Sequence, residues 1–258
     1  MSNRIPAATG WLWFKQGFAL YRKQPGLLAM LLLLTFMCFM VLNGFPLIGQ
    51  IVAALLIPSF NIARMQACYL IEKGQPVSPS VLFTGFRKDS FGPLCKLGVV
   101  YLVLFMIFMV ILALSISPEF VKQFELARTS KKPPTLATGE VVKMLAIGLT
   151  LQLALLLMSF APALTYWKQM PPLKATFYSV FAIIGSARAF AVLLVSWFGI
   201  LFIVLQLVSL LFRNTEISLS LSLFALFLFE LLRRLAIYAS YRQLFPDDAP
   251  LKEEAAPD

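Results

Sequence analysis

Side chains that could carry out chemistry are scarce in this sequence. It contains no histidine, which removes zinc-hydrolase motifs, haem ligation by His, and Ser-His or Cys-His nucleophile pairs. It has no Gly-rich phosphate loop ending in Gly-Lys-Ser/Thr, so ATP is not an obvious energy source. Cys38, Cys68 and Cys95 lack metal-ligand spacing, and we interpret them as packing residues. We therefore expect a protein that is not an enzyme and that has no cofactor and no metal site.

One set of polar residues recurs at corresponding places in three apolar segments. In each segment a cation follows another polar residue by three positions, and in the first two segments a proline precedes the cation by six. We call this set the polar layer. Its members are Asn61, Arg64, Thr165, Lys168, Glu230, Arg233 and Arg234. The prolines, Pro58 and Pro162, should kink their helices and free the carbonyls of Ala54 and Met158.

The polar layer allows two interpretations. Glu230 lies deep in an apolar segment, where a carboxylate needs a cation or a proton. Arg233 and Arg234, at i+3 and i+4, could pair with it locally, and Arg64 could do so across helices. A functional layer would bind an anionic headgroup or couple a proton. A structural layer would consist of one ion pair and of cations whose side chains extend to the water at the inner interface. We favour this structural interpretation because every cation lies close enough to that interface to reach water.

Six apolar stretches of about 18 to 25 residues must position this layer, and each could cross roughly 30 Å of hydrocarbon as a helix. Hydrophobic residues make up 60% of the 258 residues, and the mean hydropathy is +0.83. A soluble core of that size cannot bury so much apolar surface. The predicted spans are Pro25 to Leu42, Leu47 to Leu70, Lys96 to Ile116, Val141 to Tyr166, Arg188 to Phe212 and Ile217 to Tyr238. We predict an all-α polytopic membrane helix bundle with six transmembrane helices.

The distribution of positive charge predicts the orientation. The net charge is +10, but the basic residues lie at the ends of the spans rather than in a stripe for nucleic acid, so we expect no nucleic-acid partner. If the N-terminus is inside, the inside segments carry 16 of the 22 Lys and Arg residues and the outside segments 6. Because cytoplasmic segments are enriched in Lys and Arg, both termini should be cytoplasmic.

An amphipathic segment precedes the first, third and fifth spans on the predicted inside face. Each combines aromatic residues at helical spacing with nearby Lys or Arg, a pattern typical of helices at the lipid headgroup boundary. The candidate interfacial anchors are Trp11, Phe14, Phe18, Phe83, Phe86, Phe177 and Phe181. These segments predict contacts with membrane lipids, in particular anionic headgroups on the cytoplasmic face.

Together with the spans, these segments suggest an internal repeat of an interfacial helix followed by a helical hairpin. The units cover about 8 to 71, 78 to 170 and 171 to 242, within a single transmembrane domain from 1 to 245. The remaining residues, 246 to 258, form a short acidic segment rich in Pro and Ala, which we expect to be a disordered cytoplasmic tail.

Three motifs resemble a family of uncharacterised proteobacterial inner-membrane proteins. They are Gly-Trp-Leu-Trp-Phe-Lys-Gln-Gly-Phe-Ala-Leu-Tyr-Arg-Lys-Gln-Pro from Gly10 to Pro25, Phe-Pro-Leu-Ile-Gly from Phe45 to Gly49, and the run from Val81 to Arg87. The resemblance covers nearly all of the chain except the outer loop and the tail. It implies a six-helix protein of the bacterial inner membrane and assigns no activity to any residue.

Three classes of function remain, and we rank them by the features present. The first is a non-enzymatic membrane accessory or scaffold that could interact with lipid and with a membrane-protein partner. The second is a small-molecule or lipid permease that uses the polar layer. The third, an enzyme acting on lipid, needs chemistry that the sequence does not display. A water-filled cavity from the Glu230 layer to Gln152 would favour the permease, and a closed bundle would favour the scaffold.

Overall fold

The computed structural model describes residues 5–45, 47–121, 138–213 and 216–246, and within them every regular element is a helix. The long helices are α2 (Pro25–Asn43), α3 (Ile48–Glu72), α4 (Lys88–Ser115), α6 (Thr138–Leu157), α9 (Ala187–Phe212) and α10 (Glu216–Leu244). The shorter ones are α1 (Thr9–Lys23), the 3₁₀ helix η1 (Pro79–Phe86), α7 (Ala161–Trp167) and α8 (Pro172–Gly185). The predicted all-α class is therefore confirmed. Residues 247–258 of the expected tail lie outside the described residues.

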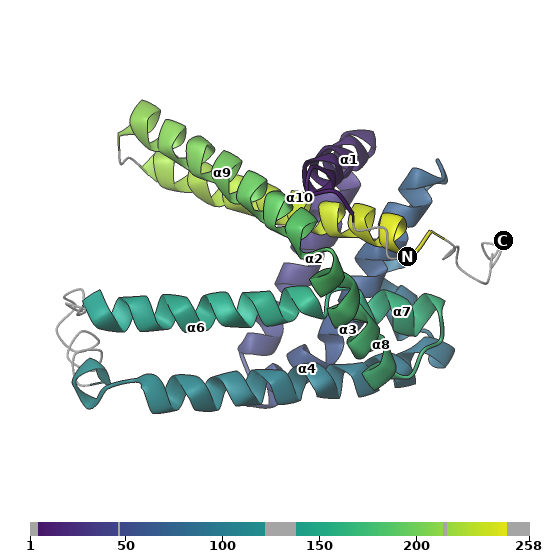
Figure 1. The fold of residues 1–258 in the computed structure, drawn as a ribbon, viewed down its shortest axis with the longest axis horizontal. Helices are drawn as coiled ribbons and strands as arrows, with labels where there is room; N and C mark the ends of the chain where they lie inside the picture. Colours follow the sequence, from purple (N-terminus) through teal and green to yellow (C-terminus); the bar gives the residue numbers. More distant parts are fainter. Residues whose placement is uncertain (1–4, 46, 122–137, 214–215, 247–258) are drawn as a thin grey trace.

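The long helices pair into three hairpins, α2–α3, α4–α6 and α9–α10, and a short helix precedes each of them (Figure 1). These short helices are α1, η1 and α8, at the three places where the sequence predicts interfacial segments. Proline lies in the first turn of α2, η1, α7 and α8, where its fixed φ favours helix initiation and its missing N–H has no consequence.

Among the described residues, five segments are long and apolar enough to cross a bilayer: α2, α3, α4, the combined α6 and α7 segment, and α9. The sixth predicted span coincides with α10, which is long enough but carries Glu230, Arg233 and Arg234 in its second half. Many apolar side chains on these helices face outward; for example, Leu114 is 83% exposed and Leu210 74% exposed. Such a surface requires lipid around it, as in a membrane helix bundle.

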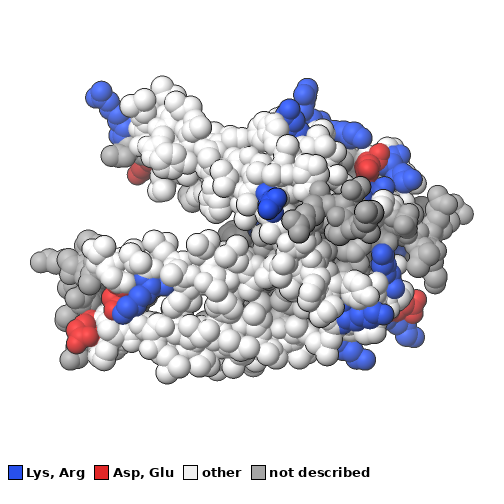
Figure 2. Space-filling model, viewed as in Figure 1, with Lys and Arg blue, Asp and Glu red and all other residues white. Residues whose placement is uncertain are grey.

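The surface view separates charged ends from a nearly uncharged middle (Figure 2). Lys and Arg gather at the end opposite the tips of the α4–α6 and α9–α10 hairpins. We call this the basic end. The two hairpins diverge from it, and the arms that border the gap are mostly uncharged on the face shown, with a Lys or Arg side chain near its inner end. The charge distribution matches a bilayer that surrounds the middle of the helices and leaves the basic end in one headgroup region.

The best-packed part of the molecule lies at the basic end. An aromatic cluster joins α1, α7, α9 and α10, and Phe160 lies near its centre, with ring centroids 6.0 Å from Phe190 and 5.6 Å from Tyr241. Trp13 of α1 is fully buried, packs on Phe190 and donates its indole N–H to Gln243 at 2.6 Å. The hairpins are thus held together at one end, while their outer parts are exposed to the lipid.

Two glycines let α1 lie directly on the α9–α10 hairpin. A Cβ atom at Gly10 would lie 2.0 Å from the carbonyl oxygen of Ala189 in α9, and one at Gly17 would lie 2.7 Å from the amide nitrogen of Ala236 in α10. Both distances are too short for any side chain. The glycines lie seven residues apart, on the same face as the buried Trp13. The sequence interpretation recognised the opposite, aromatic face of α1 but missed this packing face.

The fourth predicted span is broken rather than kinked. Helix α6 ends at Leu157 and α7 begins at Ala161, one residue before Pro162. Pro162 has no N–H to donate to the Met158 carbonyl, which instead accepts from the Ala161 amide at 3.1 Å and from the Tyr101 hydroxyl at 3.0 Å. Ser179 of α8 spans the break, because it donates to the Leu157 carbonyl at 2.6 Å and accepts from the Phe160 amide at 3.1 Å. Helix α3, in contrast, continues through Pro58.

Removing the Ser179 hydroxyl should destabilise this break. Ser179→Ala leaves the Phe160 amide and the Leu157 carbonyl without their partner in a buried site, so we expect the free energy of unfolding to fall by about 1–3 kcal/mol. Thermal unfolding in detergent measures the loss. Thr150→Ala is the matched control, because Thr150 is exposed and bonds only the Ala146 carbonyl of its own helix. Equal losses in the two variants would show that Ser179 does not hold the break.

Candidate functional site

The polar layer centres on the carboxylate of Glu230, halfway along α10. Arg233 binds both carboxylate oxygens, with Nε and Nη2 at 2.9 and 2.8 Å. Arg234 forms an ion pair with the same group at 2.6 Å. These are the i+3 and i+4 pairings that the sequence predicts for this acid. The side chains of all three residues are only 20–32% exposed, so charge-assisted bonds compensate for the partial loss of hydration.

The layer also connects α10 to α3. Arg234 donates to the Asn61 side-chain oxygen at 3.4 Å, and Arg64 donates to the same oxygen. Arg64 therefore joins the layer through Asn61. One amide oxygen between two guanidinium groups holds two cations that would otherwise repel each other.

The other two members of the proposed layer are Thr165 of α7 and Lys168, the residue that follows α7. Thr165 is 1% exposed, and its hydroxyl has no hydrogen-bond partner among the described residues. The Lys168 ammonium lies 5.1 Å from the ring centroid of Phe245 at the end of α10. The structure thus brings the α3 and α10 members together, while Lys168 stacks on an aromatic ring of the basic end.

Sequence reasoning missed the continuation of the layer toward the basic end. Tyr238 donates a hydrogen bond to Glu72, the last residue of α3, and Arg242 pairs with Glu72 at 3.3 Å. On α10 the polar residues therefore follow one another every four positions from Glu230 to Arg234, Tyr238 and Arg242. We call this α3–α10 contact the polar seam. The spacing of four was the signal available in the sequence, because it places all these side chains on one helix face.

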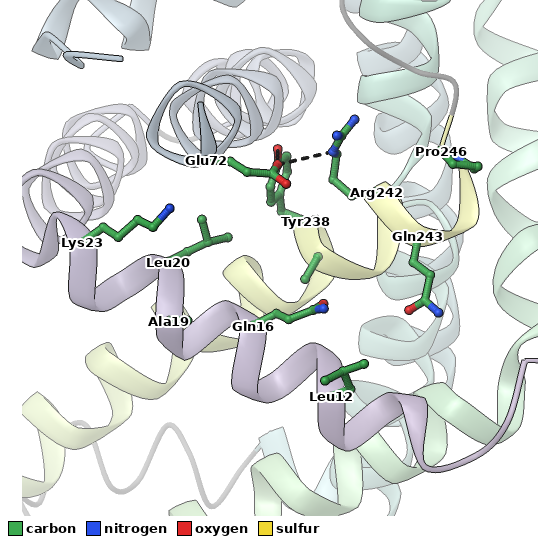
Figure 3. Close-up of a pocket in the computed structure, with 11 residues that line it drawn as sticks. Leu12, Gln16, Ala19, Leu20, Lys23, Glu72, Tyr238, Arg242, Gln243 and Pro246 are labelled. Carbon is green, nitrogen blue, oxygen red and sulfur yellow. Dashed lines mark hydrogen bonds and ion pairs between the residues drawn. The ribbon is translucent and has the colours of Figure 1, made fainter. Parts of the chain in front are cut away.

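The polar seam ends in an open groove of about 520 Å³ between α1, α3 and α10 (Figure 3). Glu72, Tyr238 and Arg242 form one side, and Gln16 and Lys23 of α1 approach from the other. Leu12 and Leu20 add apolar surface. The groove contains two cations, Lys23 and Arg242, and one acid, Glu72, which already forms an ion pair with Arg242. It could accept a polar headgroup or small solute, and it contains no free nucleophile or His among the described residues.

Two of the three α1 anchors, Trp11 and Phe18, are exposed, whereas Phe14 packs against the cluster around Trp197 in the α9–α10 hairpin. Trp11 and Phe18 are 40% and 45% exposed, and Trp11 stacks on the half-buried Phe14 at 5.5 Å. The Lys15 ammonium lies 5.5 Å from the centre of the Trp11 ring. Aromatic surface with an adjacent cation at the basic end is what an interfacial helix presents to lipid headgroups.

The other two short helices also present apolar side chains. On α8, Phe177 and Phe181 are exposed and their rings lie 4.3 Å apart, next to the exposed Lys174. On η1, Phe83 is exposed, whereas Phe86 is half-buried and packs on Phe60 of α3 at 5.5 Å. Phe86 thus helps to fix η1 on the bundle. Within the described part of the chain, no group of three or more His, Cys, Asp or Glu is placed to hold a metal ion.

Comparison with known proteins identifies a relative in the bacterial inner membrane. A probable inner membrane protein of Burkholderia thailandensis is 32% identical over 204 residues, which cover 76% of this chain and 74% of that protein. No family model matches the chain. No solved structure matches it. With its apolar helices, this similarity makes the protein a multi-pass inner membrane protein. The chain belongs to the same family of inner membrane proteins as the Burkholderia relative, in agreement with the resemblance found in its sequence motifs.

Proposed function

We propose that the protein is a non-enzymatic accessory or scaffold of the inner membrane, and that its basic end binds anionic lipid headgroups of the cytoplasmic leaflet. One observation carries the proposal: α1, η1 and α8 lie against the bundle and each presents at least one exposed aromatic side chain near Lys or Arg. The remainder of the protein would hold these three helices in place and leave its outer helix surfaces for lipid or for a membrane-protein partner.

The expected strength of this contact follows from its two components. Full burial of one large apolar side chain contributes about 1.5–3 kcal/mol, and the partly exposed anchors would each add a fraction of this. Each Lys or Arg near an anionic surface adds about 1 kcal/mol. On α1 alone, Lys15, Arg22 and Lys23 are exposed. The charged contribution is therefore comparable to the apolar one, so the lipid contact should depend on headgroup charge.

We further propose that both termini are cytoplasmic, as the division of 16 inside and 6 outside cations favours. Single cysteines at Gln75 and Glu119, introduced after removal of the native cysteines, test this orientation in intact cells. An impermeant maleimide should label the cysteine at Glu119 from outside and leave the one at Gln75 unlabelled. Labelling in the reverse pattern would place the basic end outside.

A permease remains the alternative, because the polar seam leads from mid-helix Glu230 to the groove at the basic end, and because α6 and α7 form a broken helix of a kind found at transporter sites. Against it, Glu230 is already bound by two arginines, and the backbone groups at the break bond to Tyr101 and Ser179. These groups are engaged within the protein, which supports the structural role.

Headgroup dependence of stability tests the proposed function. In a neutral detergent, phosphatidylglycerol should raise the Tm of the protein by several degrees more than phosphatidylcholine does. The reason is that a ligand of the folded state stabilises it, and 1 kcal/mol corresponds to about 2–4 °C for a chain of this size. The combined variant Lys15→Gln, Arg22→Gln and Lys23→Gln should lose most of this difference.

The control variant removes cations from the opposite end of the molecule. Lys143→Gln combined with Arg213→Gln changes exposed cations near the hairpin tips and should keep the response to phosphatidylglycerol. If both variants respond like the native protein, or if the two lipids act alike on the native protein, the basic end does not select anionic headgroups.

A further inference from the structure

The amide of Gln152 has no hydrogen-bond partner among the residues that the structure describes. Gln152 lies on α6, midway along the 30-residue apolar segment from Thr138 to Trp167, which places it near the centre of the bilayer. Its side chain is exposed, and it forms no hydrogen bond with any described residue. Sequence reasoning expects such a membrane glutamine to bond a neighbouring helix. Within the described part of a single copy, no neighbouring helix bonds this amide.

This position is unfavourable for an isolated monomer. In hydrocarbon an unpaired amide loses its hydrogen bonds to water and gains nothing in return, at a cost of about 1–3 kcal/mol or more. Gln206, another exposed glutamine of an apolar helix, differs because it lies within two turns of the outer end of α9, in a pocket with Ser209 and Arg213. Its amide can therefore reach the polar boundary, and that of Gln152 cannot.

The surface around Gln152 suits close contact with another helix. Leu145, Gly148, Leu149 and Gln152 follow the i, i+3, i+4, i+7 pattern of one helix face, and all four are exposed. A Cβ at Gly148, one turn before Gln152, would meet nothing within 4 Å. The segment containing α6 is also the least covered of the candidate spans, with 11% of its most apolar stretch buried, against 17–50% for the others.

We propose that this face of α6 is the interface of a two-fold symmetric homodimer, in which the Gln152 amides of two copies bond to each other. An amide carries both a donor and an acceptor, so two of them related by a two-fold axis form reciprocal N–H···O=C bonds. A second copy supplies the matching amide at the same depth, and it brings no unpaired charge into the hydrocarbon. Gly148 permits the close approach that such interhelical bonds need.

Cysteine crosslinking in native membranes tests the interface. The starting chain has Cys38, Cys68 and Cys95 replaced by Ala, and a single cysteine stands at Leu149 or at Thr150. Both positions are exposed and adjacent, but only Leu149 lies on the proposed face. Oxidation should give a covalent dimer from the Leu149→Cys chain and little from the Thr150→Cys chain.

The amide itself is tested by Gln152→Leu, which should weaken dimerisation by about threefold to thirtyfold, the range measured for interhelical hydrogen bonds in membranes. Gln152→Asn should keep most of the dimer, and Gln206→Leu should keep all of it. Energy transfer between fluorescently tagged copies that retain the native cysteines gives an independent measurement if the cysteine-free chain does not fold. Equal crosslinking at positions 149 and 150, no crosslinking at either, or unchanged association of Gln152→Leu would overturn the proposal.

Discussion

Glu230→Gln should lower the free energy of unfolding by about 2 kcal/mol and the Tm in detergent by several degrees. The change removes the charge that Arg233 and Arg234 both bind and leaves two cations in a partly buried layer. Adding Arg234→Gln to the Glu230→Gln chain should then lower the free energy of unfolding by much less than Arg234→Gln does alone. The reason is that the carboxylate with which Arg234 pairs is already absent. The double-mutant cycle should show a coupling of about 0.5–3 kcal/mol.

The Glu140–Lys143 pair is the control for Glu230. It has the same i, i+3 spacing at 3.1 Å; the Glu140 side chain is 15% exposed, but its single cation, Lys143, is 55% exposed and can turn to water, so Glu140→Gln should change stability by less than about 0.5 kcal/mol. Additive losses from Glu230→Gln and Arg234→Gln would reject the structural ion pair. A stable Glu230→Gln variant with altered retention of a lipid or solute would instead favour the permease.

Gly10→Ala should have an effect of similar or larger size on the attachment of α1. The new Cβ would lie 2.0 Å from the Ala189 carbonyl oxygen and 2.7 Å from the Leu193 amide nitrogen, so the helix must move away from α9. We expect a loss of about 1–3 kcal/mol, typical of overpacking, because displacement of α1 also disrupts the packing of Trp13 and its bond to Gln243. Thermal unfolding and limited proteolysis near residue 24 measure it.

Gly199→Ala on α9 is the matched control, since its Cβ would meet nothing within 4 Å. It should be neutral or stabilising by about 0.5–1 kcal/mol, as expected when alanine replaces glycine inside a helix. If Gly10→Ala is as stable as Gly199→Ala, α1 does not rest on the hairpin through its glycines.

Apolar length and proline position predicted most of the helical framework. The predicted spans from Pro25 to Leu42 and from Arg188 to Phe212 agree with α2 and α9 to within one residue at each end. Helix α4 begins at Lys88 rather than Lys96, because its first two turns are too polar to count as membrane span. Pro162 marked a disturbance in the fourth span. Whether the helix only bends or breaks completely depends on Tyr101 and Ser179. These residues come from other helices and bond the backbone at the break, so Pro162 alone could not predict it.

The candidate site was predictable where it rests on local spacing. The pairing of Glu230 with Arg233 and Arg234 follows from positions on one helix face. The bonds of Asn61 to Arg234 and of Glu72 to Tyr238 join residues more than 160 positions apart, so they depend on how α3 meets α10. Alignment of supposed repeats suggested Thr165 and Lys168 as members of the layer, but it could not place them, because equivalent positions in a repeat need not share neighbours.

The most direct test of the central claim is the quenching of Trp11 fluorescence by brominated lipids in reconstituted vesicles. The difference between the native protein and Trp11→Phe isolates this residue, since Trp13, Trp167 and Trp197 are buried. If the basic end gathers anionic headgroups, brominated phosphatidylglycerol should quench the difference signal more strongly than phosphatidylcholine brominated at the same chain positions and present at the same mole fraction. Equal quenching by the two lipids, or strongest quenching by bromine at the bilayer centre, would contradict the account.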